Sequence, residues 1–234
     1  MSQKITLDSV LLLGFAGFFS ALLTVCAPPL PEVIRDLLPG TLFGVSLSLC
    51  LWSRKILRSF WKTLIIVAAS SIALFCAALA GAGIEYFSPW PSAPEPGKGF
   101  SNLSATALFV GGTLGVFLFL ATVLLLVRSG TPWTRVLLRA LGWSPVGGFL
   151  GIVGWNLGPW LGAVLWTLQN TLGLTRSHDT FADAIPRGDA GMNSLMLVWQ
   201  TGVGLVLALA LADQQAAALD ADGKSGMVPT KSFS

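Results

Sequence analysis

Long apolar stretches recur along the whole chain, and they constrain its fold more than any other feature of the sequence. Most of them approach the roughly 20 residues that a helix needs to cross the hydrocarbon core of a bilayer. Only 11% of the residues are charged, whereas a soluble domain usually has about 25%. A single buried core does not account for this deficit, because apolar runs recur along the length of the 234-residue chain. The sequence therefore predicts an all-α integral membrane protein.

Prolines, glycines and short polar segments divide the apolar stretches into a bundle of about six transmembrane helices, which form one domain over residues 1–212. The first stretch has features of a secretion signal, but Pro28 would directly follow the candidate cleavage position, so we expect an uncleaved helix. Residues 213–234 are polar, and we expect them to form a disordered cytoplasmic tail. The predicted helices cover residues 7–27, 41–57, 63–84, 103–127, 146–168 and 192–212.

Two stripes of small residues indicate where these helices pack. The segment Gly142–Thr167 carries glycines at intervals of three and four residues, which form one smooth stripe on a helix. The backbone of another helix can approach such a stripe closely. Pro159 lies within the same predicted helix and should kink it. The predicted helix-packing residues of the two stripes are Gly147, Gly151, Gly154, Gly158, Gly162, Ala69, Ala73, Ala77 and Gly81.

Basic residues gather in two segments between the predicted helices. The segment Ser53–Lys62 is amphipathic as a helix, and residues 128–145 are expected to contain a short interfacial helix. Two interpretations stay open: a general anchor in the cytoplasmic leaflet, which we favour, or recognition of a particular anionic lipid. The residues predicted to contact anionic lipid are Arg54, Lys55, Arg58, Lys62, Arg135 and Arg139.

The distribution of basic residues also predicts the topology. Six crossings put both termini on one side, and the positive-inside rule makes that side the cytoplasm of an inner (plasma) membrane. Ten of the 14 basic residues then face inward, and the net charge of +3 does not require a nucleic-acid partner. Broken, glycine-containing elements open the second and fifth helices, so a 3+3 pseudo-repeat is a further prediction. The four basic residues in outward loops are Arg35, Lys98, Arg176 and Arg187.

Few residues in the predicted helices have side chains that could transfer a proton, bind a solute or hold a metal. The helix cores contain no Asp, Glu, Lys, Arg or His, although proton-coupled carriers and pumps commonly need an ionisable group there. Asn156 and Gln200 could bond each other between helices, which we favour, or face a solute. His178 lies beside Asp179 and Asp183 in a polar loop, but a catalytic zinc usually has three protein ligands, so we expect no metal and no cofactor.

The sequence contains no nucleophile elbow, dinucleotide-binding fingerprint or zinc-protease motif. We therefore expect a non-enzymatic membrane protein that acts through helix packing or partner helices in the bilayer. Homo- or hetero-oligomers could form through the glycine-rich helix faces. The alternative is a small-solute carrier or channel with a path along the second and fifth helices. A cavity lined by Asn156 and Gln200 would favour transport, whereas a dry, closely packed glycine stripe would favour a scaffold.

Overall fold

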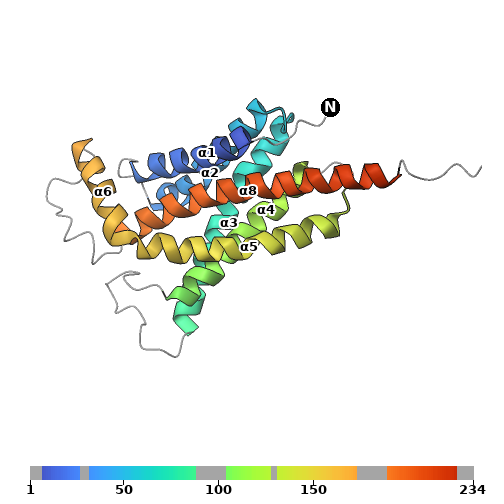
Figure 1. Cartoon of the computed structure of the whole chain (residues 1–234). Helices are drawn as coiled ribbons and strands as arrows, with labels where there is room; N and C mark the ends of the chain where they lie inside the picture. The colour runs from blue at the N-terminus through green and yellow to red at the C-terminus, as the bar shows by residue number, and fades with distance from the viewer. Residues whose placement is uncertain (1–6, 27–31, 88–103, 128–130, 173–188, 226–234) are drawn as a thin grey trace, which may run out of the picture.

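The computed structural model describes residues 7–26, 32–87, 104–127, 131–172 and 189–225. Within these ranges the chain forms α-helices joined by short turns, and no strand is present. Figure 1 shows the arrangement of the helices and their order along the chain. The helices are α1 (Leu7–Val25), α2 (Glu32–Ser53), α3 (Phe60–Phe87), α4 (Ala105–Val127), α5 (Trp133–Asn156), α6 (Gly158–Thr171) and α8 (Asp189–Ser225).

Among the described residues, five helices are long and apolar enough to cross a membrane. α2 adds a shorter apolar segment, Leu37–Ser53, which measures about 25 Å at about 1.5 Å per residue. The predicted class, an all-helical multi-pass membrane protein, is confirmed. The five long apolar spans are Leu7–Val25, Phe60–Ile84, Ala105–Val127, Trp133–Asn156 and Asn193–Ala217.

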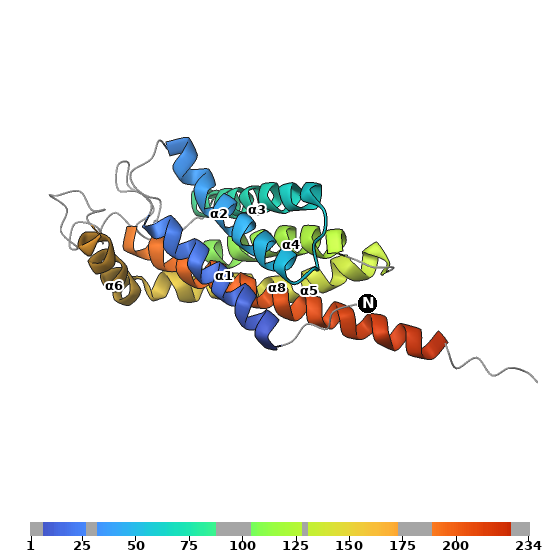
Figure 2. The same cartoon turned by 90° about the horizontal axis from the view of Figure 1, so that it is seen from above.

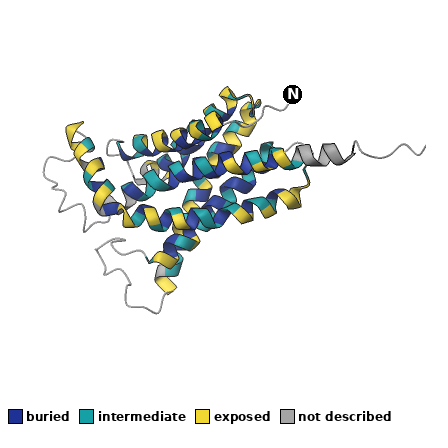
Figure 3. Cartoon of the chain, in the orientation of Figure 1, coloured by how far each residue is buried: buried dark blue, intermediate teal, exposed yellow. Residues whose placement is uncertain are grey.

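Six helices form a closed ring in which each packs against the next: α1 on α2, α2 on α3, α3 on α4, α4 on α5, α5 on α8, and α8 back on α1. Figures 1 and 2 show α8 running between α1 and α5 and continuing past the end of the bundle. α6 packs on α8 and turns sharply away from α5 (Figure 1). Buried residues cover the facing sides of the helices, and exposed residues lie on their outer sides (Figure 3).

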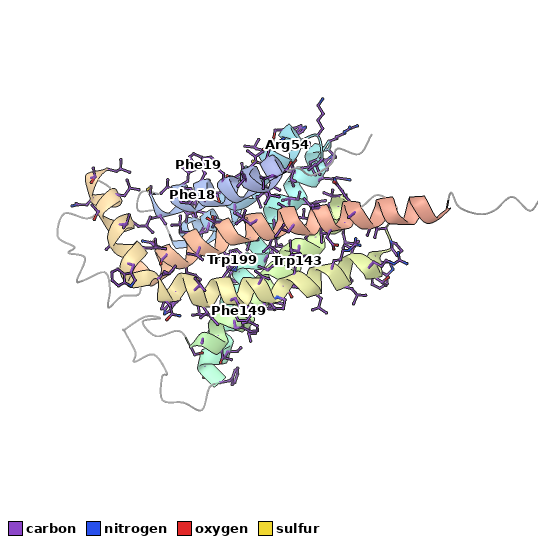
Figure 4. All side chains as sticks on the ribbon, in the orientation of Figure 1. Phe18, Phe19, Arg54, Trp143, Phe149 and Trp199 are labelled. Atoms are coloured by element: carbon purple, nitrogen blue, oxygen red, sulfur yellow. The ribbon has the colours of Figure 1, made fainter. Side chains whose placement is uncertain are left out.

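An aromatic cluster fills the centre of the ring. Phe43 of α2, Phe119 of α4 and Trp199 of α8 are each 5% exposed or less. The ring centroids of Phe43 and Phe119 lie 5.3 Å apart, and those of Phe43 and Trp199 lie 6.2 Å apart, distances typical of favourable aromatic pairs. Figure 4 shows Trp199 in the middle of the bundle. Because α2, α4 and α8 are alternate members of the ring, contacts among them cross its centre and occupy it with side chains.

The helix predicted over residues 146–168 is divided in the structure. α5 ends at Asn156, and α6 begins at Gly158 after a break at Leu157. Pro159 therefore lies in the first turn of α6, where its missing N–H removes no helical hydrogen bond. The structure therefore has a helix break just before Pro159 in place of the expected kink.

The beginning of α5 also differs from the prediction. No separate interfacial helix occupies the described part of residues 128–145, because Trp133 to Pro145 form the first half of α5. Pro145 lies inside the helix and costs it a backbone hydrogen bond. Within a membrane, neighbouring helices and local adjustments of the backbone make such a proline tolerable.

The segment predicted as an amphipathic helix between α2 and α3 forms a tight turn, which we call the basic turn (Arg54–Ser59). The Lys55 N–H bonds the Trp52 carbonyl at 2.8 Å, and the Ile56 N–H bonds the Leu51 carbonyl at 3.0 Å. This is the Schellman pattern that ends a helix, and it needs a left-handed residue. Lys55 supplies it with φ 56°. The predicted amphipathic helix over Ser53–Lys62 is therefore wrong, and so is the predicted helix end at residue 57.

Both α2 and α8 are longer than expected. α2 begins at Glu32 rather than at residue 41, and it includes Pro39. α8 continues to Ser225, so residues 213–225 are helical and not disordered. The run from Gln214 to Leu219 contains only alanine, glutamine and leucine, which favour helix, and it extends α8 beyond the apolar part.

Candidate functional site: a buried polar node

The side chain of Gln200 lies where three helices meet, and it is completely buried. Its Oε1 accepts a hydrogen bond from the Ser20 hydroxyl of α1 at 2.8 Å, and its Nε2 donates to the Pro39 carbonyl of α2 at 3.3 Å. Only the amide nitrogen can donate to a carbonyl, so the Pro39 contact fixes the orientation of the amide. The Ser20 hydroxyl also lies 2.8 Å from the Gly17 carbonyl of its own helix. These contacts, which we call the Gln200 node, join α8 to α1 and α2.

Glycines allow the backbones of α1 and α8 to touch beside the node. A Cβ atom placed on Gly17 would lie 2.7 Å from the Gln200 carbonyl carbon, and one placed on Gly204 would lie 3.0 Å from the Leu13 carbonyl carbon. Any larger residue at Gly17 would require the helices to move, because the nearby atoms belong to the backbone. The close approach brings the short Ser20 side chain within reach of Gln200.

The neighbouring helices contact α2 close to a weak point in its hydrogen-bond ladder. Pro39 has no N–H, so the hydrogen-bond ladder of α2 lacks one bond there. On the α3 side, the Ser70 hydroxyl donates to the Gly40 carbonyl at 2.8 Å, and the Thr41 and Ser71 hydroxyls lie 3.1 Å apart. α2 is thus held by α8 on one side and by α3 on the other, at the level where its own ladder is interrupted.

Asn156 lies apart from the Gln200 node. It is exposed, and its Nδ2 donates to a carbonyl of its own helix at 2.8 Å. The structure therefore does not bring Asn156 and Gln200 together. The polar contact between α5 and α8 comes instead from Ser194, whose hydroxyl donates to the Gly154 carbonyl at 3.0 Å. Sequence reasoning missed Ser20 and Ser194, because a serine in an apolar helix commonly bonds its own preceding turn and gives no sign of a partner on another helix.

The glycine stripe of α5 and α6 faces other helices of the same chain. A Cβ atom on Gly147 would lie 2.6 Å from the Gly112 carbonyl oxygen of α4, and one on Gly154 would lie 2.9 Å from the Leu195 Cα of α8. The stripe thus contacts α4 at one level and α8 at another. Three further residues of the stripe are buried: Gly151, Gly158 and Gly162.

The small residues of α3 face α4. A Cβ atom on Gly111 of α4 would lie 2.6 Å from the Ala77 carbonyl oxygen. Ala73 and Gly81, one turn to either side of Ala77, are both buried. Ala69 is only partly buried. Adjacent glycines of α4 therefore meet the two predicted stripes: Gly111 faces Ala77 of α3, and Gly112 faces Gly147 of α5.

The six basic residues predicted to contact lipid fall into two groups. Lys62 Nζ donates to the Leu126 carbonyl in the last turn of α4 at 2.6 Å, and Arg139 pairs with Asp213 of α8 at 3.1 Å. A cation at the C-terminal end of a helix is favourable because that end carries partial negative charge. Both side chains are therefore engaged within the bundle. The other four basic residues form no ion pair with the described part of the chain: Arg54, Lys55, Arg58 and Arg135.

No side chains of the described ranges are assembled for metal binding. They contain no group of three or more His, Cys, Asp or Glu residues that could hold an ion. His178 and its acidic neighbours Asp179 and Asp183 lie outside the described residues. Cys26, just beyond the end of α1, is not disulfide-bonded. Burial raises the pKa of its thiol, so the less reactive protonated form predominates at neutral pH.

Comparison of the chain with protein-family models, curated proteins and solved structures finds no significant match. The assignment of a function must therefore depend on the packing of the bundle and on the distribution of its charges.

Proposed function

We propose that this chain is a non-enzymatic, multi-pass inner-membrane protein whose role depends on helix packing and on contacts with partner helices in the bilayer. The observation that carries the proposal is the filled interior of the six-helix ring. Phe43, Phe119 and Trp199 occupy its centre, and both polar atoms of the Gln200 side-chain amide are hydrogen-bonded. A solute path needs polar groups that face water, whereas these groups bind one another.

A small-solute carrier or channel is the alternative. A path along α2 and α5 would have to avoid α8, which contacts both helices. The Gln200 amide reaches the Pro39 carbonyl of α2, and the Ser194 hydroxyl reaches the Gly154 carbonyl of α5. These contacts place α8 as a bridge between α2 and α5 and support the packing role over transport.

The glycine contacts support the same role and change where a partner would bind. Gly147 and Gly154 already contact α4 and α8 of the same chain, so they are not free for a second molecule. A partner helix, from another copy or another protein, would instead meet the large apolar side chains on the outer faces of α1 and α3. Exposed examples are Leu11, Phe15, Phe75 and Leu79.

We further propose six crossings, formed by α1, α2, α3, α4, α5 and α8, with both termini in the cytoplasm. α6 would lie along the opposite surface of the membrane. The support comes from the basic residues, which gather at the end of the bundle where α2 meets α3 and α4 meets α5. Figure 4 labels Arg54 at this end, away from α6. In this topology α1–α3 and α4–α8 enter from opposite faces, as a 3+3 pseudo-repeat requires.

Cysteine accessibility separates the packing role from transport. Ser48 of α2 and Ser144 of α5 are buried along the alternative path, and Ser53 is exposed at the end of α2. Each serine is changed to cysteine in a chain without its three native cysteines, and a membrane-impermeant maleimide is applied to either side of sealed vesicles. Serine and cysteine have similar size, so the fold should persist.

Under the packing proposal, Ser53→Cys reacts from the cytoplasmic side only, and Ser48→Cys and Ser144→Cys stay unmodified from both sides. If either buried position reacts at a rate close to that of Ser53→Cys, water reaches the helix interior and the carrier interpretation replaces ours. Reaction of Ser53→Cys from the outer side would contradict the proposed topology and leave the packing role unaffected.

A further inference from the structure

The basic turn between α2 and α3 combines a fixed backbone with freely exposed cations. Leu57 is only 1% exposed and anchors the turn in the core of the bundle. Lys55 stands at the left-handed position of the Schellman pattern, which directs the chain sharply back toward α3. Both Lys55 and Arg58 are exposed. The buried Leu57 and the Schellman hydrogen bonds therefore fix the backbone of the turn, and its charged side chains are exposed.

Lys55 and Arg58 are close to one another within this turn. The Arg58 Nε donates a long hydrogen bond of 3.4 Å to the Lys55 carbonyl. Neither residue forms an ion pair with any described part of the chain. Lys62, four residues further on, differs because its ammonium group is bonded to the Leu126 carbonyl. Two uncompensated positive charges on one short turn favour the binding of an anion there.

Aromatic residues on both sides of the turn indicate where this anion comes from. Trp52 precedes the turn, and Phe60 and Trp61 follow it; Trp61 is 72% exposed. α2 ends and α3 begins at this point, so the turn lies at the limit of two apolar helices. Exposed tryptophans at such a limit are typical of the headgroup region of a bilayer. A water-soluble anion would not need them.

We propose that the basic turn binds the phosphate of an anionic phospholipid headgroup, with Lys55 and Arg58 contacting the phosphate and Trp52 and Trp61 lying beside the acyl chains. The inference is independent of the proposed function, since a scaffold or a carrier could have this site. It also divides the basic residues of the segment: Lys55 and Arg58 bind lipid, and Lys62 supports the end of α4.

The test measures the thermal unfolding midpoint of the purified full chain in a mild detergent. Phosphatidylglycerol, phosphatidylcholine with the same acyl chains, or inorganic phosphate is titrated into separate samples. The variants are Lys55→Asn with Arg58→Gln, and Lys62→Gln as the matched loss of a cation in the same segment. Asparagine tolerates the left-handed backbone at position 55 better than most residues do. The single variants Arg58→Gln and Lys55→Gly serve if the double variant does not fold.

We expect phosphatidylglycerol to raise the midpoint of the unmodified chain more than phosphatidylcholine does. A surface cation contributes about a fivefold gain in anionic-lipid binding, so the double variant should need about 25-fold more lipid for the same shift. Lys62→Gln should lower the starting midpoint but keep the lipid response.

Three outcomes would overturn the site. An equal loss of response in Lys62→Gln would mean that diffuse charge, and not the basic turn, attracts the lipid. An equal response to inorganic phosphate would identify a soluble anion as the ligand. No preference for phosphatidylglycerol over phosphatidylcholine would show that the basic turn does not bind an anionic headgroup.

Discussion

Replacing Gly147 by alanine should force α4 and α5 apart, because the two backbones touch at this residue. The added Cβ would lie 2.6 Å from the Gly112 carbonyl oxygen and 2.7 Å from the Val116 Cβ. Neither atom is the end of a flexible side chain, so a helix must move. Gly142 offers a matched control on the same helix, since a Cβ there would meet no atom within 4 Å.

The expected magnitude follows from the difference between the two variants. Alanine is favoured over glycine in a helix by about 1 kcal/mol, and both variants gain this amount. Only Gly147→Ala adds the cost of overpacking, roughly 1–3 kcal/mol. Gly142→Ala should therefore raise the free energy of unfolding, and Gly147→Ala should fall about 1–3 kcal/mol below it. The helix propensity cancels in this comparison, so the gap reports the interhelical contact alone.

The assay is unfolding of the purified chain in mixed micelles, with denaturing detergent titrated and tryptophan fluorescence as the signal. The chain has nine tryptophans, of which Trp133, Trp143 and Trp155 lie on α5 and Trp199 lies beside Gly115 of α4. The double variant Gly112→Ala with Gly147→Ala should be less destabilised than the sum of the single variants, because one displacement of the helices relieves both contacts. If Gly147→Ala proves as stable as Gly142→Ala, the backbone contact between α4 and α5 does not exist in the folded protein.

Three further variants test other parts of the bundle in the same assay. Gln200→Leu should lower the free energy of unfolding by about 1 kcal/mol, in the range of buried interhelical hydrogen bonds in membranes, and an unchanged midpoint would show that the Gln200 node does not hold α1 and α2 to α8. Lys55→Gly should raise the free energy of unfolding by about 1 kcal/mol, because glycine removes the strain of the left-handed conformation. A lower midpoint would mean that the Lys55 side chain stabilises the fold by more than the strain costs. Asp213→Asn should lower it by less than about 1 kcal/mol, and by less still in high salt, because the Arg139–Asp213 pair is partly exposed; a larger, salt-independent loss would show that the carboxylate has a second, buried role.

The sequence was sufficient for the class of the protein and for the limits of its most regular helices. α1 and α4 end within two residues of the predicted limits, because long apolar runs bounded by proline-rich or polar segments define a helix without reference to its neighbours. The break at Leu157 was not predictable in the same way. Pro159 can either kink one helix or start another, and the contacts of α6 with α8, which the sequence does not reveal, accompany the second outcome.

The basic turn shows a second limit of reading periodicity. The spacing of Arg54, Arg58 and Lys62 fits a helical face, yet the chain turns after Ser53. The sequence did not indicate this helix end, because glycine usually occupies the left-handed position and lysine stands there instead. At the Gln200 node, the polar residue itself was identified, but its partners were not. One partner is the carbonyl of Pro39, and a backbone group carries no sequence signal.

The break at Leu157 also affects the number of times that the chain can cross the bilayer. An unbroken helix over residues 133–171 would measure about 58 Å at about 1.5 Å per residue, roughly twice the thickness of the hydrocarbon core. The break leaves a helix α5 of 24 residues, which is long enough to cross, and a helix α6 of 14 residues, which is too short. The parity of the crossings depends on this division. If α6 passed through the membrane, the chain would emerge on the opposite side, and α8 would place the C-terminus on the side opposite to the one we propose.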